Sequence, residues 1–192
     1  KTPFSDVIFT SKSNKTLMNL VPVVNLQDYI SGDSSKKGSF VQALGQAYET
    51  LGFVAVEGHG IPDNTISDFY KLIEQFFALP LENKLKYEVP EFAGQRGYTS
   101  FGREKAKQSE VPDLKEFWQI GQYVEGEIMP EADYPDNMDV AELDDFDAVG
   151  KDLYKSFEKA GAHLLRAIAN YLDIEENYFA SKIKNGNSIL RA

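Results

Sequence analysis

Apolar residues recur at helical spacing in three long stretches of the chain. From Phe40 to Leu51 they fall on one helical face, and Gly52 is suited to end that helix because glycine readily adopts the left-handed C′ conformation. A second apolar stripe follows Asp63, a good N-cap, and is broken at Pro80. The longest stripe runs from about Ala141 to Leu172. These patterns predict three amphipathic helices.

Shorter stretches supply the remaining predicted elements. Short helical pieces are expected at two places, Leu81–Tyr87 and Asp173–Lys184. Runs rich in β-branched and aromatic residues predict four strands: an extended edge segment at Val21–Val24, a buried strand at Phe53–Val56, and strands at Phe117–Ile120 and Asn187–Ala192. Polar composition predicts loops at Ser31–Gly38 and Tyr123–Asp139, a mostly loop segment at Glu88–Glu110, and a flexible lead-in or tag at residues 1–17.

The balance of these elements indicates an α+β fold that is incomplete. The long apolar helix faces meet only a few strands that could cover them, so we expect a missing partner layer. The last strand coincides with the end of the sequence, and a lone strand with open edges is a poor way to finish a fold. Phe69, Ile73, Phe76 and the stripe from Leu153 to Ile168 should therefore need a sheet that this chain does not supply.

Composition narrows the functions that are open to the chain. Its 192 residues carry a formal net charge of −10, and such a field disfavours nucleic acids and anionic membrane surfaces as partners. Cysteine is absent, which excludes disulfide scaffolds, zinc–thiolate sites, iron–sulfur clusters and cysteine nucleophiles. No stretch reaches the ~18 apolar residues of a membrane helix, and no secretory signal is evident. A cytoplasmic location fits these features.

Few residues have the spacing that a metal-binding or catalytic site requires. A mononuclear non-haem iron site needs two histidines and a carboxylate on one face, and His59 and His163 are the only histidines. No His-x-Asp, His-x-Glu or His-x-x-x-His spacing accompanies either one, so a turn residue and a helix-flank residue are the favoured interpretations. Ser100 and Ser109 have no histidine nearby to form a nucleophilic triad. The acidic run at 142–147 most simply solvates and caps the long helix.

Five short phrases follow one another along the chain. Each resembles a short sequence pattern. Val21–Leu26 resembles hPhIDL, Gly52–Pro62 resembles GFFxVxNHGI, and Phe76–Lys84 resembles FFxLPxExK. Arg96–Tyr98 with Asp113–Gly121 resembles RGY followed by DxKExxxxG, and Ser188–Arg191 resembles SxLRhxxYP. In this order they resemble the isopenicillin N synthase-like family of iron(II)- and 2-oxoglutarate-dependent oxygenases. One departure is Gly58 in place of the usual asparagine before His59, a position whose histidine is structural in the family.

The resemblance implies a double-stranded β-helix, or jelly-roll, core. In the family this core binds Fe(II) and 2-oxoglutarate and uses O2 to hydroxylate, desaturate or cyclise a small organic substrate. Its His-x-Asp…His iron triad and Arg-x-Ser co-substrate clamp match no position here. The resemblance therefore implies that residues 18–186 are an N-terminal oxygenase region, that 187–192 begin the truncated core, and that these residues alone hold no catalytic or metal-binding group and are inactive.

The glycine-dotted segment around the RGY phrase is the candidate for substrate contact. The candidate residues are Gln95, Arg96, Tyr98, Thr99 and Phe101. Aromatic rings here can flank an apolar substrate, while Arg96 or Gln95 meets a carboxylate or hydroxyl. The alternative is that Arg96 and Tyr98 only pin the segment to the body, because RGY recurs in family members with different substrates. Thr99 and Phe101, just beyond the motif, are then the better candidates.

Two other functions stay open. One is a non-catalytic helical interaction module that is complete as given, and a stop codon directly after Ala192 would favour it. The other is an isopenicillin N synthase-like oxidase that needs no 2-oxoglutarate. Oxygen uptake with and without 2-oxoglutarate distinguishes an oxidase of this kind from a 2-oxoglutarate-dependent enzyme.

Overall fold

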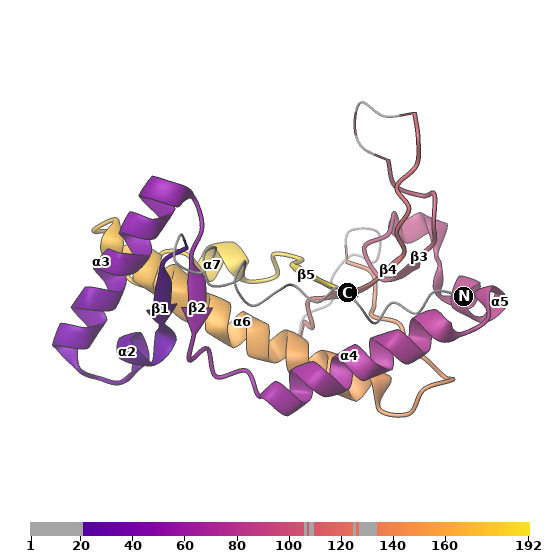
Figure 1. Cartoon of the computed structure of the whole chain (residues 1–192), viewed down its shortest axis with the longest axis horizontal. Helices are drawn as coiled ribbons and strands as arrows, with labels where there is room; N and C mark the ends of the chain where they lie inside the picture. The colour runs from indigo at the N-terminus through magenta and orange to yellow at the C-terminus, as the bar shows by residue number, and fades with distance from the viewer. Residues whose placement is uncertain (1–20, 106, 108–109, 125, 127–133) are drawn as a thin grey trace, which may run out of the picture. The chain divides into compact units, whose positions relative to one another are not determined.

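The computed structural model describes residues 21–105, 107, 110–124, 126 and 134–192 (Figure 1). The lead-in predicted at residues 1–17 lies outside the described residues. The chain divides into two compact units. The first comprises the residues up to Gly60 together with Ala160–Phe179, and the second comprises Ile61–Lys159 with Ala180–Ala192. The long helix α6 (Phe146–Tyr171) contributes residues to both units.

The first unit combines two short strands with helices. Strand β1 (Val23–Asn25) runs parallel to β2 (Ala55–Glu57), and α2 (Leu26–Ile30) and α3 (Ser34–Leu51) lie between them in the chain. Helix α3 buries its apolar face in a cluster with residues of β1, α2 and the last part of α6. Gly52 ends α3 in the left-handed conformation, which confirms the predicted end of this helix.

Two predictions for the first unit are wrong. Most of Ser31–Gly38 is helical, because α3 already begins at Ser34. There the Asp33 carboxylate accepts hydrogen bonds from the backbone amides of Ser35 (2.9 Å) and Lys36 (3.2 Å), so an N-cap stabilises a turn made of exposed polar residues. The strand expected at Phe53–Val56 is not buried, since β2 is half-buried at best and Phe53 is exposed.

The second unit contains a three-stranded antiparallel sheet. Its strands lie in the order β3 (Gly97–Thr99), β4 (Phe117–Gly121) and β5 (Ile189–Arg191). The other elements are α4 (Asp63–Ala78), α5 (Leu81–Lys84), the 3-10 helices η1 (Leu85–Tyr87) and η2 (Pro90–Phe92), α7 (Ala180–Ile183) and the first part of α6. The strand predicted at Phe117–Ile120 and the helix predicted after Asp63 are both confirmed.

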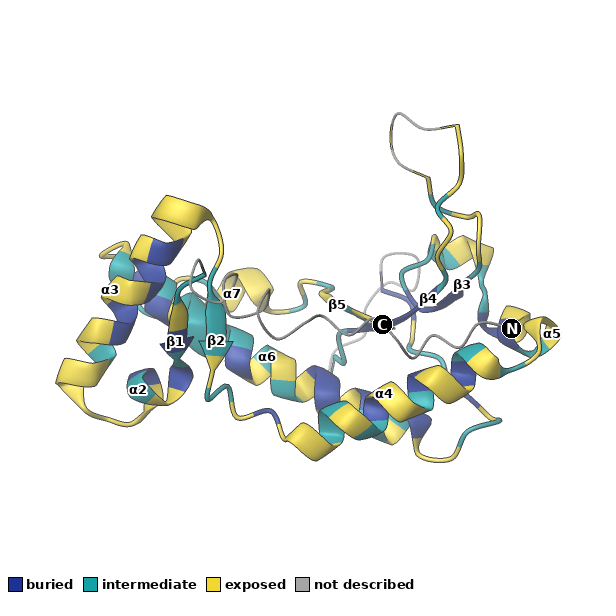
Figure 2. Cartoon of the chain, in the orientation of Figure 1, coloured by how far each residue is buried: buried dark blue, intermediate teal, exposed yellow. Residues whose placement is uncertain are grey.

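Aromatic rings fill the core of the second unit. Phe76, fully buried on α4, has ring-centroid distances of 4.8 Å to Trp118, 5.7 Å to Tyr98 and 5.8 Å to Phe146. These tilted and edge-to-face arrangements are the ones that aromatic rings favour. Because the four rings come from α4, β4, β3 and α6, this core fixes one face of the sheet against both helices, and Figure 2 shows the buried positions on these elements.

The expectation of a missing sheet is wrong for the second unit. Phe69, Ile73 and Phe76 on α4 are buried, as is Leu153 on α6, and all four belong to the cluster that includes Trp118 of β4. The last strand is not a lone one either, because β5 pairs along β4. The apolar faces of α4 and of the first part of α6 are therefore covered within this unit.

Three element boundaries also differ from those predicted. The segment predicted as mostly loop at Glu88–Glu110 contains the unpredicted strand β3, which Gly97 enters at a φ of +71°. Helix α6 begins at Phe146 and not at Ala141, since the five residues before it form turns. The helix expected over Asp173–Lys184 is reduced to α7. Among the described residues, no helix has both the length and the apolar character needed to span a membrane.

Candidate functional site

The two faces of the β3–β4–β5 sheet differ in chemistry. In the observed register Thr99 pairs with Phe117, and Gln119 pairs with Gly97 on one side and with Arg191 on the other. Side chains alternate between faces along a strand. Tyr98, Trp118 and Ile120 therefore lie on the face that packs in the aromatic core. The opposite face, which carries Thr99, Gln119 and Arg191, is called the polar face below.

Arg96, just before β3, is buried without a carboxylate partner among the described residues. It is only 1% exposed. Its guanidinium donates to the backbone oxygen of Gln95 (2.8 Å) and to Oδ1 of Asn187 (2.7 Å), and its Nε has no partner in the described part of the chain. A Cβ at Gly121 would come 1.6 Å from Cζ of Arg96, so the guanidinium occupies the space that a side chain there would need. Desolvation lowers the pKa of Arg96, against the opposing effect of nearby tyrosines.

Gln95 and Arg96 share a hydrogen-bond network with the segment that leads into β5. The Asn187 side-chain amide donates to Oε1 of Gln95 (3.0 Å), while its oxygen accepts from Arg96. Gln122 accepts from the Tyr134 hydroxyl (2.6 Å) and from the Asn187 backbone amide (3.2 Å). Hydrogen bonds thus connect the start of β3 to Asn187, which is far along the chain, and these bonds fix the positions of the Gln95 and Arg96 side chains.

Tyr98 belongs to a second buried network, which we call the Glu116 cluster: Lys84, Tyr98 and Glu116. Lys84 Nζ lies 2.7 Å from Oε2 of Glu116 and donates to the Phe77 backbone oxygen at 3.0 Å. The Tyr98 hydroxyl donates to the same carboxylate oxygen. Burial, reinforced by the Glu116 carboxylate, raises the pKa of Tyr98, so the phenol stays protonated. Residues of the FFxLPxExK, RGY and DxKExxxxG phrases meet in this cluster, a role that their letters alone did not reveal.

Thr99 and Phe101, the two favoured candidates, have different surroundings. Thr99 is buried on the polar face, and its Oγ1 has no hydrogen-bond partner among the described residues. It lines a pocket of about 240 Å³ together with Glu88, Pro90, Gly94, Arg103 and Glu104. Phe101 follows β3 and is 55% exposed. The structure therefore leaves these two side chains available for contact, whereas the polar groups of Arg96 and Tyr98 bond mostly within the chain.

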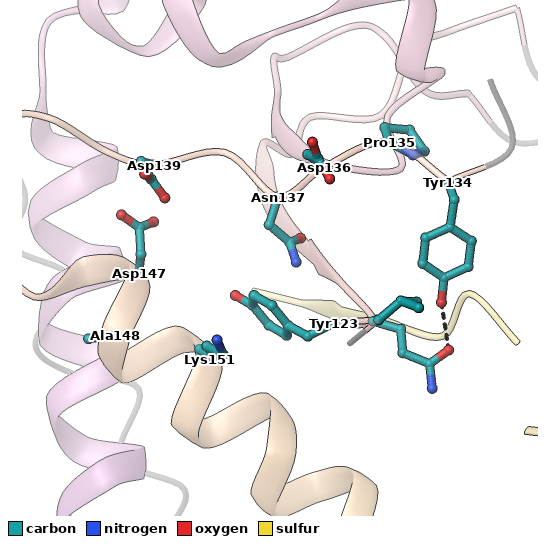
Figure 3. A pocket seen from close by; sticks show the side chains of 11 residues that line it. Tyr123, Tyr134, Pro135, Asp136, Asn137, Asp139, Asp147, Ala148 and Lys151 are labelled. Atoms are coloured by element: carbon teal, nitrogen blue, oxygen red, sulfur yellow. Dashed lines mark hydrogen bonds between the residues drawn. The ribbon is translucent and has the colours of Figure 1, made fainter. Parts of the chain in front are cut away.

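A larger pocket of about 560 Å³ lies between the end of β4, the segment around Asn137 and the start of α6 (Figure 3). Figure 3 shows the carboxylates of Asp139 and Asp147 turned toward one another, with Lys151 and Tyr123 in the same wall. Desolvation, together with the Asp139 carboxylate, raises the pKa of Asp147 to about 6. Desolvation and the nearby aspartates likewise raise the pKa of Tyr123 to about 12. At neutral pH the pocket is acidic, with Lys151 Nζ 5.0 Å from the centroid of the Tyr123 ring.

The acidic run predicted to cap α6 serves two purposes. Asp147 lies in the first turn of the helix, where a negative charge is favoured. Glu142 instead accepts hydrogen bonds from the Tyr87 hydroxyl and from Lys86 Nζ (3.1 Å). These bonds, with desolvation opposing them, lower the pKa of Glu142. Of these acidic residues only Asp147 therefore lies in the first turn of α6, and the capping of the helix by the run stays a prediction.

The described residues do not fit an iron site. Among them, no three histidine, cysteine, aspartate or glutamate side chains are grouped closely enough to hold a metal ion. His59 follows β2 and His163 lies on α6, and each takes part in other interactions of the fold.

Comparison with known proteins gives a family and several relatives. The family described as non-haem dioxygenase in morphine synthesis, N-terminal, matches residues 21–142. Proline hydroxylase buaE of Petromyces alliaceus is 31% identical over 169 residues, which cover 85% of this chain and 51% of that protein. The 2-oxoglutarate-Fe(II) type oxidoreductase hxnY of Emericella nidulans is 25% identical over 179 residues, covering 88% and 51%. The chain thus spans about half the length of the curated relatives it matches.

Two solved structures are similar in fold. A putative 2OG-Fe(II) oxygenase family protein from Caulobacter crescentus has a TM-score of 0.77 at 33% sequence identity, covering 89% of this chain and 54% of that one. A full-length Neurospora crassa protein in complex with alpha-KG has a TM-score of 0.73 at 28% identity, covering 89% and 53%. Both likenesses extend over nearly all of the chain and over about half of the solved protein.

Proposed function

The chain belongs to the family of non-haem dioxygenase N-terminal regions, and from that premise we propose that the complete protein is an Fe(II)- and 2-oxoglutarate-dependent oxygenase that oxidises a small organic substrate with O2. The single observation that carries the proposal is the family match, which spans most of the described residues. The solved structures of similar fold, one of them with alpha-KG bound, support it. No observation favours the alternative of a non-catalytic helical module.

We further propose a division of tasks along the protein. Because the described residues form no group that fits iron, the iron ligands and the 2-oxoglutarate clamp would lie in parts of the protein outside this chain. The jelly-roll core that the family resemblance implies would begin within residues 187–192, after an N-terminal region at 18–186. The bound iron and co-substrate would supply the oxidising chemistry, and no step through them is derived from these residues.

The proposed contribution of this chain is a wall of the substrate site at β3. Gln95, Arg96 and Tyr98 would act as positioning residues, because their hydrogen bonds fix β3 against β4 and the segment before β5. Thr99 and Phe101 would touch the substrate, since neither side chain is engaged in a hydrogen bond or a buried ring contact within the described chain. This wall would orient the substrate and keep water from its apolar parts.

The proposal also covers the cellular location and the partners of the complete protein. A cytoplasmic location is supported by the absence of cysteine, and the net charge of −10 disfavours nucleic-acid and membrane partners. Hydroxylation, desaturation and ring closure are all compatible with the family.

Turnover of 2-oxoglutarate by the complete protein tests the proposed function. The purified protein should form succinate from 2-oxoglutarate in the presence of Fe(II) and O2, and should cease to do so when a chelator removes the iron. Oxygen uptake that depends on iron but not on 2-oxoglutarate would instead establish the oxidase alternative. The absence of both activities in a folded, iron-loaded protein would contradict the proposal.

A further inference from the structure

The polar face of the sheet holds two polar side chains, Thr99 and Gln119, whose hydrogen-bonding groups are not all used within the described part of the chain. Oγ1 of Thr99 has no hydrogen-bond partner within the described part of the chain. The side-chain oxygen of Gln119 accepts from Arg191 Nε (3.1 Å), but its NH2 group donates to no described residue. Thr99 and Gln119 are only 6% and 4% exposed. Buried polar groups are nearly always paired, so the unpaired Thr99 hydroxyl, beside an unused donor on the neighbouring strand, indicates a place for a ligand.

Both groups point to the space beside Gly94. This glycine has a φ of +75°, and a Cβ built on it would lie 3.2 Å from Oγ1 of Thr99 and 3.6 Å from Nε2 of Gln119. The absence of a side chain at residue 94 therefore leaves the space beside the two polar atoms unfilled by a Cβ. Gly94 and Thr99 also line the pocket of about 240 Å³, so this pocket adjoins the space beside Gly94.

The charges around this pocket are already paired. Glu88 accepts from the Ser100 backbone amide and from Arg103 Nε, both at 3.1 Å. Glu104 lies 3.2 Å from Lys115 Nζ and 3.6 Å from the guanidinium of Arg191. Among the described residues that line the pocket, no cation is left over to neutralise an anionic ligand, and both carboxylates already have cations. The groups that remain, a hydroxyl and an amide, are neutral and match a neutral partner.

We propose that this pocket binds a neutral amide or lactam group of the substrate, whose carbonyl oxygen accepts from the Gln119 NH2 group and whose N–H donates to the Thr99 hydroxyl. A lactam presents its carbonyl and N–H on the same edge of the ring, so it reaches two adjacent groups at once. The inference rests on the proposed function, because it assigns one group of that enzyme's substrate. It adds Gln119 to the residues that determine specificity.

Binding of three small ring compounds to the complete protein tests the proposal without any turnover. The probes are 2-piperidone, piperidinium and cyclohexanecarboxylate, which are a neutral lactam, a cation and an anion of similar size. Ligand-observed NMR should show that 2-piperidone binds roughly tenfold more tightly than either charged probe. Thr99→Val and Gln119→Leu should each weaken lactam binding by about 3- to 10-fold, as expected for one hydrogen bond. Gly94→Ala should abolish it, and the control Thr65→Val on α4 should change nothing.

A second measurement separates a binding role from a structural one. Thr99→Val removes a hydroxyl that has no partner among the described residues, so it should raise the Tm of the ligand-free protein by about 2 °C, whereas loss of a structural hydroxyl lowers it. Equal affinities for the three probes, or lactam binding that survives Thr99→Val and Gln119→Leu, would overturn the proposal. If the lactam binds as predicted but the protein forms no succinate, the proposed oxygenase function is refuted and the lactam-binding pocket is supported. If succinate forms but the lactam does not bind as predicted, only the proposal of a lactam-binding pocket is refuted.

Discussion

At the scale of single residues, the Glu116 cluster is the most consequential arrangement for stability. Lys84 and Glu116 form a buried ion pair, and Tyr98 shares the same carboxylate oxygen. Removing one partner of a buried pair leaves an uncompensated charge. We therefore expect Lys84→Met to lower the free energy of unfolding by about 3–5 kcal/mol, measured by denaturant or thermal unfolding of the complete protein.

Two control variants sharpen this prediction. Lys115→Met breaks an exposed pair with Asp113 and Glu104 and should have no measurable effect on stability. The double variant Lys84→Met with Glu116→Leu removes both charges and should recover much of the loss. A Lys84→Met protein as stable as the Lys115→Met control would show that the Glu116 cluster does not stabilise the fold.

Phe101 is the residue whose predicted role is most directly tied to substrate. Its ring is more than half exposed, so Phe101→Ala should leave the Tm nearly unchanged. If the ring covers an apolar part of the substrate, the variant should raise KM by about 10-fold or more, which corresponds to losing a contact worth roughly 1–3 kcal/mol. Uncoupled turnover of 2-oxoglutarate should persist. Leu114→Ala, also exposed and between β3 and β4, is the matched control.

Asp147 makes the stability of the protein depend on pH. Desolvation and Asp139 raise its pKa from 3.8 to about 6 in the folded state, so the folded protein binds a proton more tightly than the unfolded chain does. The stabilisation that the protonated Asp147 side chain gives the folded state is fully present below about pH 4 and is lost as pH rises through about 6. Asp147→Asn should therefore raise stability at pH 7 by about 1 kcal/mol, after allowance for solvent screening of a partly exposed group.

The measurement for Asp147 is Tm against pH from 4 to 8. The wild-type and Asp147→Asn curves should meet near pH 4 and separate above pH 6. Asp144→Asn, on the exposed stretch before α6, controls for the loss of one negative charge. Curves that stay parallel over the whole range would show that Asp147 titrates normally.

At the scale of elements, two glycines distinguish the buried and exposed sides of α3. A Cβ at Gly45 would lie 2.1 Å from the Tyr171 ring, whereas nothing lies within 4 Å of one at Gly38. Gly45→Ala should therefore lower stability by about 1–3 kcal/mol through overpacking. Gly38→Ala should raise it by about 0.5–1 kcal/mol, because alanine loses less conformational freedom in a helix. The two shifts in Tm should have opposite signs, and a stabilising Gly45→Ala would refute the α3–Tyr171 packing.

Some helices and strands could be predicted from the spacing of apolar residues, and others could not. The apolar stripes of α3, α4 and α6 were predictable because their buried faces repeat at helical spacing. The first turn of α3 was not, because its residues are polar and are stabilised by the Asp33 cap and by contacts such as the Lys37–Glu176 ion pair rather than by an apolar face. Strand β3 was also missed. Its short Gly97–Thr99 run lies among glycines and charges, and its burial comes from partners distant in sequence such as Trp118.

At the scale of the whole molecule, the motifs predicted the family but not how their residues are used. Thr99 and Phe101 were reached because they flank a recognisable phrase. Gln119 was not, because nothing in Phe117–Gly121 shows which side chains face away from the aromatic core until β3 and β5 are paired with β4. The joining of Lys84, Tyr98 and Glu116 likewise depends on contacts between residues far apart in sequence, which local patterns do not encode.

The central claim is that these residues support and contact the substrate while iron is held elsewhere in the protein. The most direct test is the iron bound per chain by the complete protein carrying both His59→Asn and His163→Asn, with its Tm as the check on folding. We predict that the double variant binds one Fe(II) per chain, as the wild type does. Loss of iron from a variant that remains folded would place a metal ligand in this chain and contradict the account.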